Sequence, residues 1–411
     1  MMEEKDMRLI DRVLRMKIKI FGIEMECIDM MFGIIILTFG LVARLYLFDV
    51  VSGDYADAFA DWMREIRQAH ENGLLYISMI PKQTDACTFD YNCLPQYLFC
   101  FLSLFHGVMS DMYLVKTASV VFDFVSAITI FRIVYEITGN VRKSMLGLGV
   151  ALAVPTVILN SAAWAQNDSI YTAFILLSFL SVLKKRDIST FVYVGLAFCF
   201  KQQTVFFFPF LIIMWLKNKI KIRYILIVPA LYILAMVPAA IAGRPWDNLL
   251  GIYSNQVAMF SRLSMNYPSI YTIITSQMTN EYRSYLTSAG MMITVMLMGF
   301  LAYYTYQKKF RITPQYMLTL VVFTGELITF CLPCMHERYG FIAEIFAFIY
   351  GLFGWKRMCI AIGFEVLTLI TYTRYLFGST IAYLYPLTGI MLVLILFVGY
   401  DLYQQMQKEK A

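Results

Sequence analysis

Apolar runs of about 20 residues recur along the whole of this 411-residue chain. A helix of that length, rising about 1.5 Å per residue, crosses the roughly 30 Å hydrocarbon core of a bilayer. Hydrophobic residues make up 60% of the chain and charged residues only 15%, whereas soluble domains hold about 25% charged residues. Because backbone polar groups in lipid must be hydrogen-bonded within their own segment, the runs should form helices. The sequence therefore predicts an all-α polytopic membrane protein with a single membrane-embedded domain over 1–411.

The basic residues indicate how the chain threads through the membrane. Residues 1–20 contain six Lys or Arg, which predicts a cytoplasmic N-terminus over 1–22. A basic amphipathic helix is predicted there by the spacing of Ile10, Val13, Leu14 and Lys17. Six further basic clusters follow, at 142–143, 184–186, 217–223, 307–311, 355–357 and in the C-terminal tail. All six are cytoplasmic only if the apolar run 94–110 does not cross, so we expect 94–110 to lie in or dip into the outer leaflet and both termini to be cytoplasmic.

This threading predicts about 12 transmembrane helices in the plasma membrane. They lie at roughly 27–48, 114–136, 145–161, 168–183, 188–201, 203–216, 224–241, 285–306, 314–331, 339–354, 358–374 and 384–401. Two large segments remain outside: a long first extracytoplasmic loop, 49–113, which carries amphipathic helices, and a second loop, 242–284. The net charge of +6 belongs mainly to the short inner loops, so it is a topology signal, and no nucleic-acid partner is expected.

Polar clusters that interrupt the apolar runs gather on the predicted outer face. Ionisable side chains at membrane depth are costly, so they suggest a functional site by default. A transporter would place such groups near the midplane, whereas these lie at the outer boundary, which predicts a reaction site at the outer leaflet. The clusters contain the following residues: Asp54 and Tyr55; Asp90 and Tyr91; Gln166 and Asp168; Lys201 and Gln202; His336, Glu337 and Arg338.

Several of these residues also have ordinary structural interpretations. Asp57 and Asp61 share a helical face with Asp54, and a solvated face would explain both of them. Asp54 itself could be a helix N-cap, and His336-Glu337-Arg338 could belong to an ordinary loop. Lys201 could be a lysine that extends to the interface from a span end. Asp168 could cap the helix that begins at Ser169.

Three further features concern structure rather than chemistry. Asp123 lies in the middle of an apolar run, so we expect it to pack against a polar partner in another span. Cys87 and Cys93 could form a disulfide in an oxidising compartment, or could be free thiols. The same two alternatives hold for Cys331 and Cys334.

Five motifs, in order along most of the chain, resemble those of the membrane-embedded GT-C glycosyltransferases, which use polyprenyl-phosphate sugars. "GDYADAFADWMREI" (53–66) is similar to the first outer loop of the dolichyl-phosphate-glucose-dependent glucosyltransferases of N-glycan assembly. "DYNCLPQYL" (90–98) resembles their Asp-Tyr-Pro-Pro segment, with Asn92 and Cys93 replacing the prolines, and "FKQQT" (200–204) resembles their Lys-Gln motif. "MHERYGF" (335–341) and "WAQNDSIYTAF" (164–174) resemble segments of bacterial relatives of the GPI-anchor mannosyltransferases, with Ala165 in place of the usual Gly.

The resemblance implies a GT-C fold and an enzyme that moves a hexose, with mannose favoured, from a polyprenyl-phosphate sugar. The acceptor would be a cell-surface glycan or a lipid-linked acceptor on the extracytoplasmic face, and the anomeric centre would be inverted. In this scheme Asp54 is the general base, and donor phosphate is bound by Lys201, Arg338, His336 and Gln202. Supporting or sugar-contacting roles fall to Tyr55, Asp90, Tyr91, Gln166, Asp168 and Glu337.

No cofactor and no metal are expected. Asp54, Asp57 and Asp90 could offer oxygen ligands, but the outer loops hold no tight Asp-x-Asp, and lysine and arginine can neutralise a monophosphate. The resemblance also implies a metal-free reaction. The alternative functions are a polysaccharide polymerase, a lipid-linked-sugar transporter, or a non-catalytic assembly protein. A transporter would need basic residues through the inner half of the spans, and the sequence shows no such path.

Overall fold

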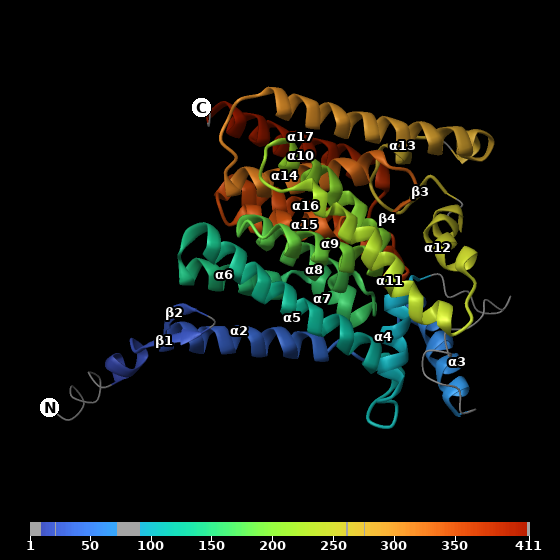
Figure 1. Ribbon diagram of the computed structural model, residues 1–411, viewed down its shortest axis with the longest axis horizontal. Helices are drawn as coiled ribbons and strands as arrows, with labels where there is room; N and C mark the ends of the chain where they lie inside the picture. Colours follow the sequence, from blue (N-terminus) through green and yellow to red (C-terminus); the bar gives the residue numbers. More distant parts are fainter. Residues whose placement is uncertain (1–9, 21, 72–90, 260–261, 275, 409–411) are drawn as a thin grey trace.

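The structure is a computed structural model that describes residues 10–20, 22–71, 91–259, 262–274 and 276–408 (Figure 1). It is almost entirely helical. The α-helices are α2 (Cys27–Leu45), α3 (Ala60–Glu71), α4 (Cys93–Ser103), α5 (Asp111–Thr138), α6 (Val141–Ala153), α7 (Pro155–Ile158), α8 (Asp168–Leu183), α9 (Asp187–Phe200), α10 (Phe208–Leu216), α11 (Ile227–Ile241), α12 (Trp246–Met259), α13 (Ser276–Gln307), α14 (Pro314–Cys331), α15 (Phe341–Gly351), α16 (Trp355–Phe377) and α17 (Leu384–Lys408).

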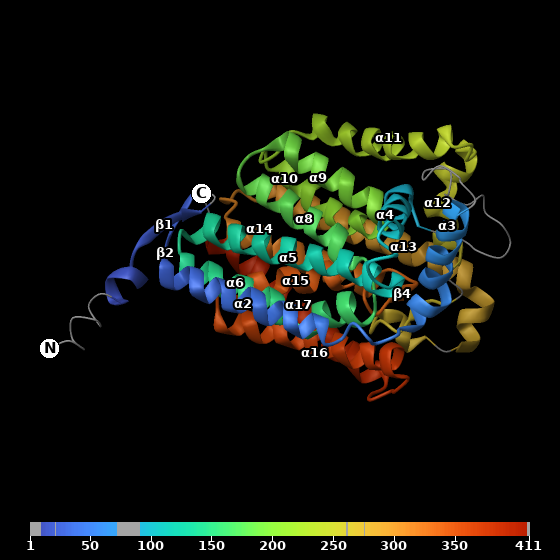
Figure 2. The same cartoon turned by 90° about the horizontal axis from the view of Figure 1, so that it is seen from below.

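Shorter elements join these helices. The π-helices η1 (Tyr55–Phe59) and η3 (Leu159–Ala163) and the 3-10 helices η4 (Gln202–Phe207), η5 (Ile222–Leu226) and η6 (Ile270–Ile273) lie between them. Strands β1 (Lys17–Ile20) and β2 (Ile23–Glu26) pair antiparallel, and β3 (Ser264–Met265) pairs in parallel with β4 (Met335–His336). The long helices lie side by side along one common direction, and the β1–β2 hairpin and the end of α17 lie at the same end of the molecule (Figures 1 and 2).

Burial separates the inner helices from the outer ones. In the most apolar 18-residue stretch of α14, 78% is buried inside the protein. The corresponding share is only 17% in α13 and 22% in α2. Apolar helices with so much exposed surface would aggregate in water, so lipid must cover them. Among the described residues, seven helices are long and apolar enough to cross a membrane: α2, α5, η5 with α11, α13, α14, α16 and α17. The predicted class, an all-α polytopic membrane protein, is confirmed, and the figure of 12 crossings stays a prediction.

The predicted span 145–161 is bent. Helix α6 and the α7–η3 segment are together long and apolar enough to cross a membrane, but they meet at an angle of 52°. The break falls at Val154, which has an extended backbone (φ −60°, ψ 118°) immediately before Pro155. Proline lacks a backbone N–H and disfavours helical geometry in the residue before it, which explains the bend. The bend directs η3 and the residues that follow it toward the candidate site.

Contacts bring the basic loops together at one end. The contacts are Arg142 with Glu26 (3.7 Å), Lys184 with Glu136 (3.6 Å), the Lys217 ammonium with the Lys308 carbonyl (2.5 Å) and Lys143 over the Phe353 ring (4.3 Å). They join the start of α2 and the loops that follow α5, α8, α10, α13 and α15. The β1–β2 hairpin lies at the same end (Figure 2).

The segment 49–113 begins and ends at the opposite end of the molecule. The Lys116 ammonium, near the start of α5, donates to the carbonyls of Phe48 (2.8 Å) and Val50 (2.6 Å), which follow α2. These carbonyls have no partner within the helix, so the lysine both satisfies them and fixes where α5 starts. Within the segment, α4 has 11 residues, or about 16 Å, about half of a bilayer core.

The predicted N-terminal helix is only partly present. Residues 10–14 are helical, but the helix expected to continue through Lys17 stops there, and the β1–β2 hairpin follows. Gly22, at the hairpin turn, has a φ of +83°, a conformation that glycine adopts without strain. The alternation Lys17-Ile18-Lys19-Ile20 has the period of a strand, and this local signal prevailed over the longer helical spacing.

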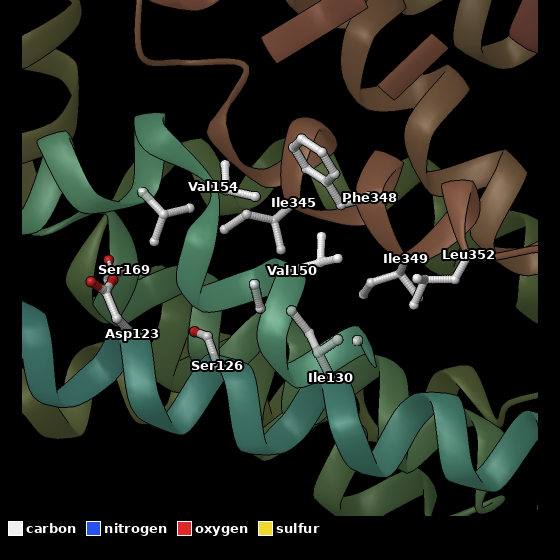
Figure 3. A pocket seen from close by; sticks show the side chains of 13 residues that line it. Asp123, Ser126, Ile130, Val150, Val154, Ser169, Ile345, Phe348, Ile349 and Leu352 are labelled. Carbon is white, nitrogen blue, oxygen red and sulfur yellow. Dashed lines mark hydrogen bonds between the residues drawn. The ribbon is translucent and has the colours of Figure 1, made fainter. Parts of the chain in front are cut away.

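Asp123 has the partner that the sequence required. Its carboxylate accepts from Arg44 of α2 (2.6 Å) and from Ser161 (2.5 Å), and both charged side chains are almost fully buried. Removing one member of such a pair costs about 3–5 kcal/mol, because the other charge is left uncompensated. The cavity beside Asp123, of about 20 Å³, is lined mainly by apolar side chains such as Ile130 and Val154, and it is too small for a substrate (Figure 3).

Candidate active site

A cavity of about 230 Å³ lies at the end of the molecule opposite the basic loops. Its walls come from η1 and α3, from the turn between η3 and α8, from the start of η4 and from the segment after α14. The lining residues are Asp54, Asp57, Ala58, Phe59, Trp62, Tyr91, Gln166, Lys201, Gln203, Gln256, His336, Arg338 and Tyr339. Segments up to about 285 positions apart in the chain therefore meet around one hollow.

Asp54 is held by one of its two carboxylate oxygens. Oδ2 accepts a hydrogen bond from the Trp164 indole N–H (3.0 Å) and another from the Gln166 amide, and it lies 3.7 Å from Arg338. Oδ1 receives no hydrogen bond from the described residues. Asp54 stands at the N-cap position of η1 but forms no capping hydrogen bond with its side chain. The capping interpretation therefore fails, and the carboxylate is fixed in orientation with one oxygen available to a ligand.

The turn that presents Trp164 and Gln166 has an unusual backbone. Ala165 has a φ of +64° and is fully buried, and this left-handed conformation costs a non-glycine residue about 1–2 kcal/mol. This is the position at which the resemblance led us to expect glycine. The turn is tied to the first outer loop by Ser52, whose hydroxyl donates to the Trp164 carbonyl (2.6 Å). The surrounding contacts hold the strained turn and so fix both donors to Asp54.

Asp168 and Lys201 form a buried ion pair below the cavity. The lysine ammonium lies 2.5 Å from Asp168 Oδ1, and the Asn160 amide donates to Oδ2 (2.9 Å). Asp168 is the first residue of α8, yet its side chain is used by Lys201 and Asn160 and not by the helix N-terminus. Lys201 is 8% exposed, so it does not extend to solvent or to the membrane interface. The ordinary interpretations of both residues, a cap and a snorkelling lysine, do not describe their contacts.

Arg338 lies among three carboxylates. Its guanidinium is 3.6 Å from Asp168, 3.7 Å from Asp54 and 3.8 Å from Glu337. These separations are longer than hydrogen bonds, and Nε makes no hydrogen bond with the described residues. The guanidinium also lies over the Trp164 ring, 5.6 Å from its centroid. The arginine is thus balanced in charge but still has donors to offer to a ligand.

His336 and Glu337 have ionisation states set mainly by burial. Burial, with Arg338 and Lys201 nearby, lowers the pKa of His336 to about 3, so the imidazole is neutral at pH 7. Burial raises the pKa of Glu337 to about 7, although Arg338 opposes the shift. The strand pairing of His336 with Met265 holds the segment in place. A neutral imidazole can still donate one hydrogen bond into the cavity.

The structure brings most of the predicted site residues together. Asp54, Tyr91, Gln166, Lys201, His336 and Arg338 line the cavity. Asp168 and Glu337 do not line it but contact its two cations. Tyr55 packs beside the cluster of Phe59 and Trp62, and Asp90 lies outside the described residues.

One predicted residue, Gln202, lies elsewhere than expected. Gln202, expected at the donor phosphate, does not line this cavity, and Gln203 lines it instead. Lys201 has an extended backbone before η4 begins, and this break in the helix decides which glutamine faces inward. Asp57 is exposed, in agreement with its interpretation as part of a solvated face, and it also lines the cavity. Sequence reasoning did not single out Trp164, although it belongs to one of the quoted motifs and holds Asp54 directly.

An apolar cleft adjoins the cavity. It has a volume of about 460 Å³ and lies between α9, η4, α12, α13 and the segment after α14. Gln203 and Tyr339 line both hollows, whereas Gln202 lines the cleft alone. The other lining residues are mainly apolar, among them Phe198, Phe206 and Met291. The polar cavity therefore continues into a surface suited to a hydrocarbon chain.

Metal and disulfide predictions have only partial answers. Among the described residues, no group of three or more His, Cys, Asp or Glu side chains is arranged to hold a metal ion. Cys331 and Cys334 are free thiols. Cys93 is also a free thiol, so it is not joined to Cys87, which itself lies outside the described residues.

No protein-family model matches this chain, and no curated protein matches it. The chemistry of the cavity is therefore argued from its own residues.

Proposed function

We propose that this chain is an integral-membrane glycosyltransferase of the GT-C type, with about 12 transmembrane helices in the plasma membrane. It moves a hexose, with mannose favoured, from a polyprenyl-phosphate sugar to a glycan or lipid-linked acceptor on the extracytoplasmic face. One observation carries the proposal: an oriented carboxylate, Asp54, and two buried cations, Arg338 and Lys201, share one cavity that opens into an apolar cleft.

Asp54 suits the role of general base. The acceptor hydroxyl attacks the anomeric carbon, its proton passes to Asp54 Oδ1, and the carbon–oxygen bond to the phosphate breaks. Attack from the face opposite the phosphate inverts the anomeric centre. The donors Trp164 and Gln166 hold Oδ2 and thereby aim Oδ1. A positioned base of this kind typically contributes about 10²–10⁴-fold to the rate.

The cations suit the leaving group. A monophosphate gains negative charge as the glycosidic bond breaks, and fixed donors in a site of low dielectric stabilise that charge. Arg338 has uncommitted N–H groups for this purpose, and an arginine fork matches phosphate oxygens in pairs. Lys201 adds a second charge, and neutral His336 can add one hydrogen bond. Because the phosphate is already a good leaving group, no general acid is required.

The adjoining cleft suits the lipid. A polyprenyl tail needs an apolar surface that begins where the phosphate is held, and Gln203 and Tyr339 form that boundary.

Polymerase and transporter functions are the alternatives. The ionisable residues buried within α14, α15 and α16 include Glu326, Glu344 and Glu365. Their carboxyl groups offer no cation to guide a phosphate-linked sugar through the membrane, so we favour the transferase.

The direct test is to incubate purified protein with a panel of polyprenyl-phosphate sugars. The expected result is acceptor-dependent release of polyprenyl phosphate from one of them. If no donor in the panel is turned over with any glycan or lipid-linked acceptor, the proposed function is wrong.

Asp54→Asn tests the base within the same assay. Asparagine keeps the size of the side chain but cannot take the proton, so transfer should fall by about 10²–10⁴-fold. Asp61→Asn is the matched control, because Asp61 lies on the same face, pairs with Arg64 near solvent and does not line the cavity. Near-normal transfer by Asp54→Asn, or an equal loss in the control, would move the base elsewhere.

A further inference from the structure

A second and larger hollow lies on the other side of Trp164. It has a volume of about 800 Å³ and is formed by the loop 262–274, the last turns of α16 and the start of α17. Among the described residues that line it there is no Asp and no Glu. Its distinctive lining residues are Arg262, Arg374, Tyr271, Tyr375, Tyr383 and Tyr385. This composition differs from that of the candidate active site, where cations and carboxylates balance one another.

The two arginines have no charge partner in the described part of the chain. Arg262 and Arg374 are both exposed, and neither forms an ion pair or a side-chain hydrogen bond with a described residue. Every guanidinium carries five N–H donors in a planar fork, which fits the oxygens of phosphate or carboxylate groups. Two such groups around one hollow make it a cation-lined site that lacks an anion.

The tyrosines add a second kind of recognition. Tyr383 and Tyr385 are largely exposed and Tyr375 is about half exposed, although all three are large and partly apolar. A tyrosine presents a flat apolar ring and a hydroxyl on one side chain, so it can pack against the C–H face of a sugar ring and hydrogen-bond to its hydroxyls. Cations and exposed tyrosines together favour a ligand that is both a saccharide and an anion.

The wall between the two hollows is thin. The Trp164 ring stacks on Tyr375 at 5.6 Å, while its indole N–H donates to Asp54 on the other side. Asn266 lines the larger hollow and bridges to His336, which lines the smaller one. A ligand that rests on Tyr375 is therefore separated from the Asp54 carboxylate by two stacked aromatic rings, those of Tyr375 and Trp164.

We propose that the larger hollow is the acceptor subsite and that it takes a saccharide carrying an oxyanion, either phosphate or carboxylate. The anion lies between Arg262 and Arg374, sugar rings lie on the tyrosines, and the reacting hydroxyl reaches around Trp164 toward Asp54. This assignment rests on the proposed transferase function. The anion-and-sugar recognition itself can be measured without turnover.

The test measures binding of three probes to the purified full-length chain: mannose 1-phosphate, mannose and inorganic phosphate. Because a sugar phosphate can also bind at Arg338, the measurement is made in an Arg338→Gln background. We expect mannose 1-phosphate to bind more tightly than either other probe. Adding Arg262→Gln and Arg374→Gln should weaken that binding by roughly 10- to 100-fold, the worth of a lost charge-assisted hydrogen bond. Arg311→Gln, at the opposite end of the molecule, is the matched control and should leave binding unchanged.

The same arginine pair, changed in the wild-type background, gives a second measurement. Replacing both arginines should lower the number of mannose 1-phosphate molecules bound per chain from two to one. This measurement does not depend on the Arg338→Gln variant, so it remains informative even if that variant folds poorly. Undiminished binding after both arginines are replaced, or equal binding of inorganic phosphate, would overturn the assignment. If the donor panel fails while this binding persists, the transferase and the acceptor role are lost, and the recognition of an anionic saccharide remains. If donor turnover succeeds without this binding, only the acceptor subsite is lost.

A further arm separates a soluble saccharide from a lipid headgroup, because both can present a phosphate. The protein is placed in nanodiscs of phosphatidylcholine or of phosphatidylglycerol. Equal binding of mannose 1-phosphate in the two lipids supports the saccharide. Loss of binding in phosphatidylglycerol alone would assign the arginines to an anionic lipid and overturn the proposal.

Discussion

At the scale of single residues, Arg338 combines two tasks that a substitution would disrupt together. It neutralises Asp54 and Asp168 from distances of 3.7 and 3.6 Å, and it keeps donors for a ligand. Arg338→Ala should raise the donor KM or lower donor kcat/KM by roughly 10- to 150-fold, because one charge-assisted bond is lost. Acceptor KM should change much less. Steady-state kinetics with each substrate varied in turn provides the measurement.

Two comparisons sharpen this prediction. Arg338→Lys keeps the charge but not the planar fork, so it should recover only part of the donor use. Arg64→Ala removes an arginine that is largely exposed and pairs with Asp61, so it should behave like the wild type. Normal donor kinetics in Arg338→Ala would show that the phosphate is held by other groups.

His336 and Glu337 should give the protein an unusual pH dependence. His336 has a pKa of about 3 instead of 6.5, so the unfolded chain binds the extra proton and stability rises with pH between those values. Glu337 has a pKa of about 7 instead of 4.5, so the folded chain binds the extra proton and stability falls as pH rises through that window. The two contributions oppose each other between pH 4.5 and 6.5, each with a slope of about 1.4 kcal/mol per pH unit.

Single variants should expose each contribution. Glu337→Gln leaves the histidine, so its thermal midpoint should fall as the pH is lowered from 6.5 to 4.5. His336→Gln leaves the glutamate, so its midpoint should fall as the pH is raised over the same interval. The measurement is thermal unfolding in detergent, and the exposed His70→Gln serves as the control. Parallel profiles for the two variants would contradict the opposing ionisations.

Residue positions were predictable from the sequence where a charged group stood out in an apolar setting. Asp54, Lys201 and Arg338 were all selected for that reason and do meet. Gln203 was not distinguishable from Gln202, because the choice depends on one extended residue between α9 and η4. Trp164 was missed for a different reason: beside the polar residues Gln166 and Asp168, a mainly apolar side chain gives no signal until its partner, Asp54, is known.

At the scale of elements, the α13 helix contains two glycines with opposite expectations. A methyl group at Gly290 would overlap the Tyr271 hydroxyl and approach Pro333 to 3.2 Å, whereas at Gly299 it would meet nothing within 4 Å. Gly290→Ala should therefore lower the stability by about 1–3 kcal/mol, the usual cost of overpacking. Gly299→Ala should be neutral or slightly stabilising, because alanine is the better helix former.

The measurement is the thermal unfolding midpoint of Gly290→Ala compared with that of Gly299→Ala. The Tyr271 hydroxyl donates to the Cys331 carbonyl (2.8 Å), so its displacement should also loosen the segment between α14 and β4. Equal stability of the two variants would mean that the helix and Tyr271 do not approach each other as described.

Element types followed from the sequence more readily than their details. The predicted spans 168–183 and 314–331 coincide with α8 and α14, because long apolar runs with polar ends leave little choice. The prediction of the span 145–161 gave only its bounds, and Pro155, which lies inside it, was an available signal for the bend. The β1–β2 hairpin was not predicted, because helical and strand periodicities overlap over so few residues.

At the scale of the whole molecule, the basic loops lie at one end and the candidate site lies at the other. If the basic end is cytoplasmic, a cysteine at Asn140, between α5 and α6, should not react with an impermeant thiol reagent added outside intact cells. A cysteine at Ser379, between α16 and α17, should react, because that loop lies at the site end. Both positions are exposed. Labelling at Asn140 would reverse the threading and remove the extracytoplasmic placement of the site.

The placement of the motifs on one face was predictable from the membrane topology, whereas the contact partners of individual residues were not. Alternation of spans already placed the five motifs on one face, and the contacts among the basic loops agree with that alternation. The sequence also indicated that Asp123 needs a polar partner. It could not identify Arg44, because 79 positions separate the two and only the packing of α2 and α5 on the same helix, α6, brings them together.

The position of Arg338 also imposes a sequence of events on the proposed reaction. In the empty cavity its charge is divided among Asp54, Asp168 and Glu337. A phosphate that enters competes for the guanidinium and draws it away from Asp54, which then has only Trp164 and Gln166 beside it. The acceptor hydroxyl thus meets a carboxylate released from its cation only when donor is already in place. Transfer would therefore begin only when the donor is in place, because its phosphate must draw Arg338 away before Asp54 can take the proton of the acceptor hydroxyl.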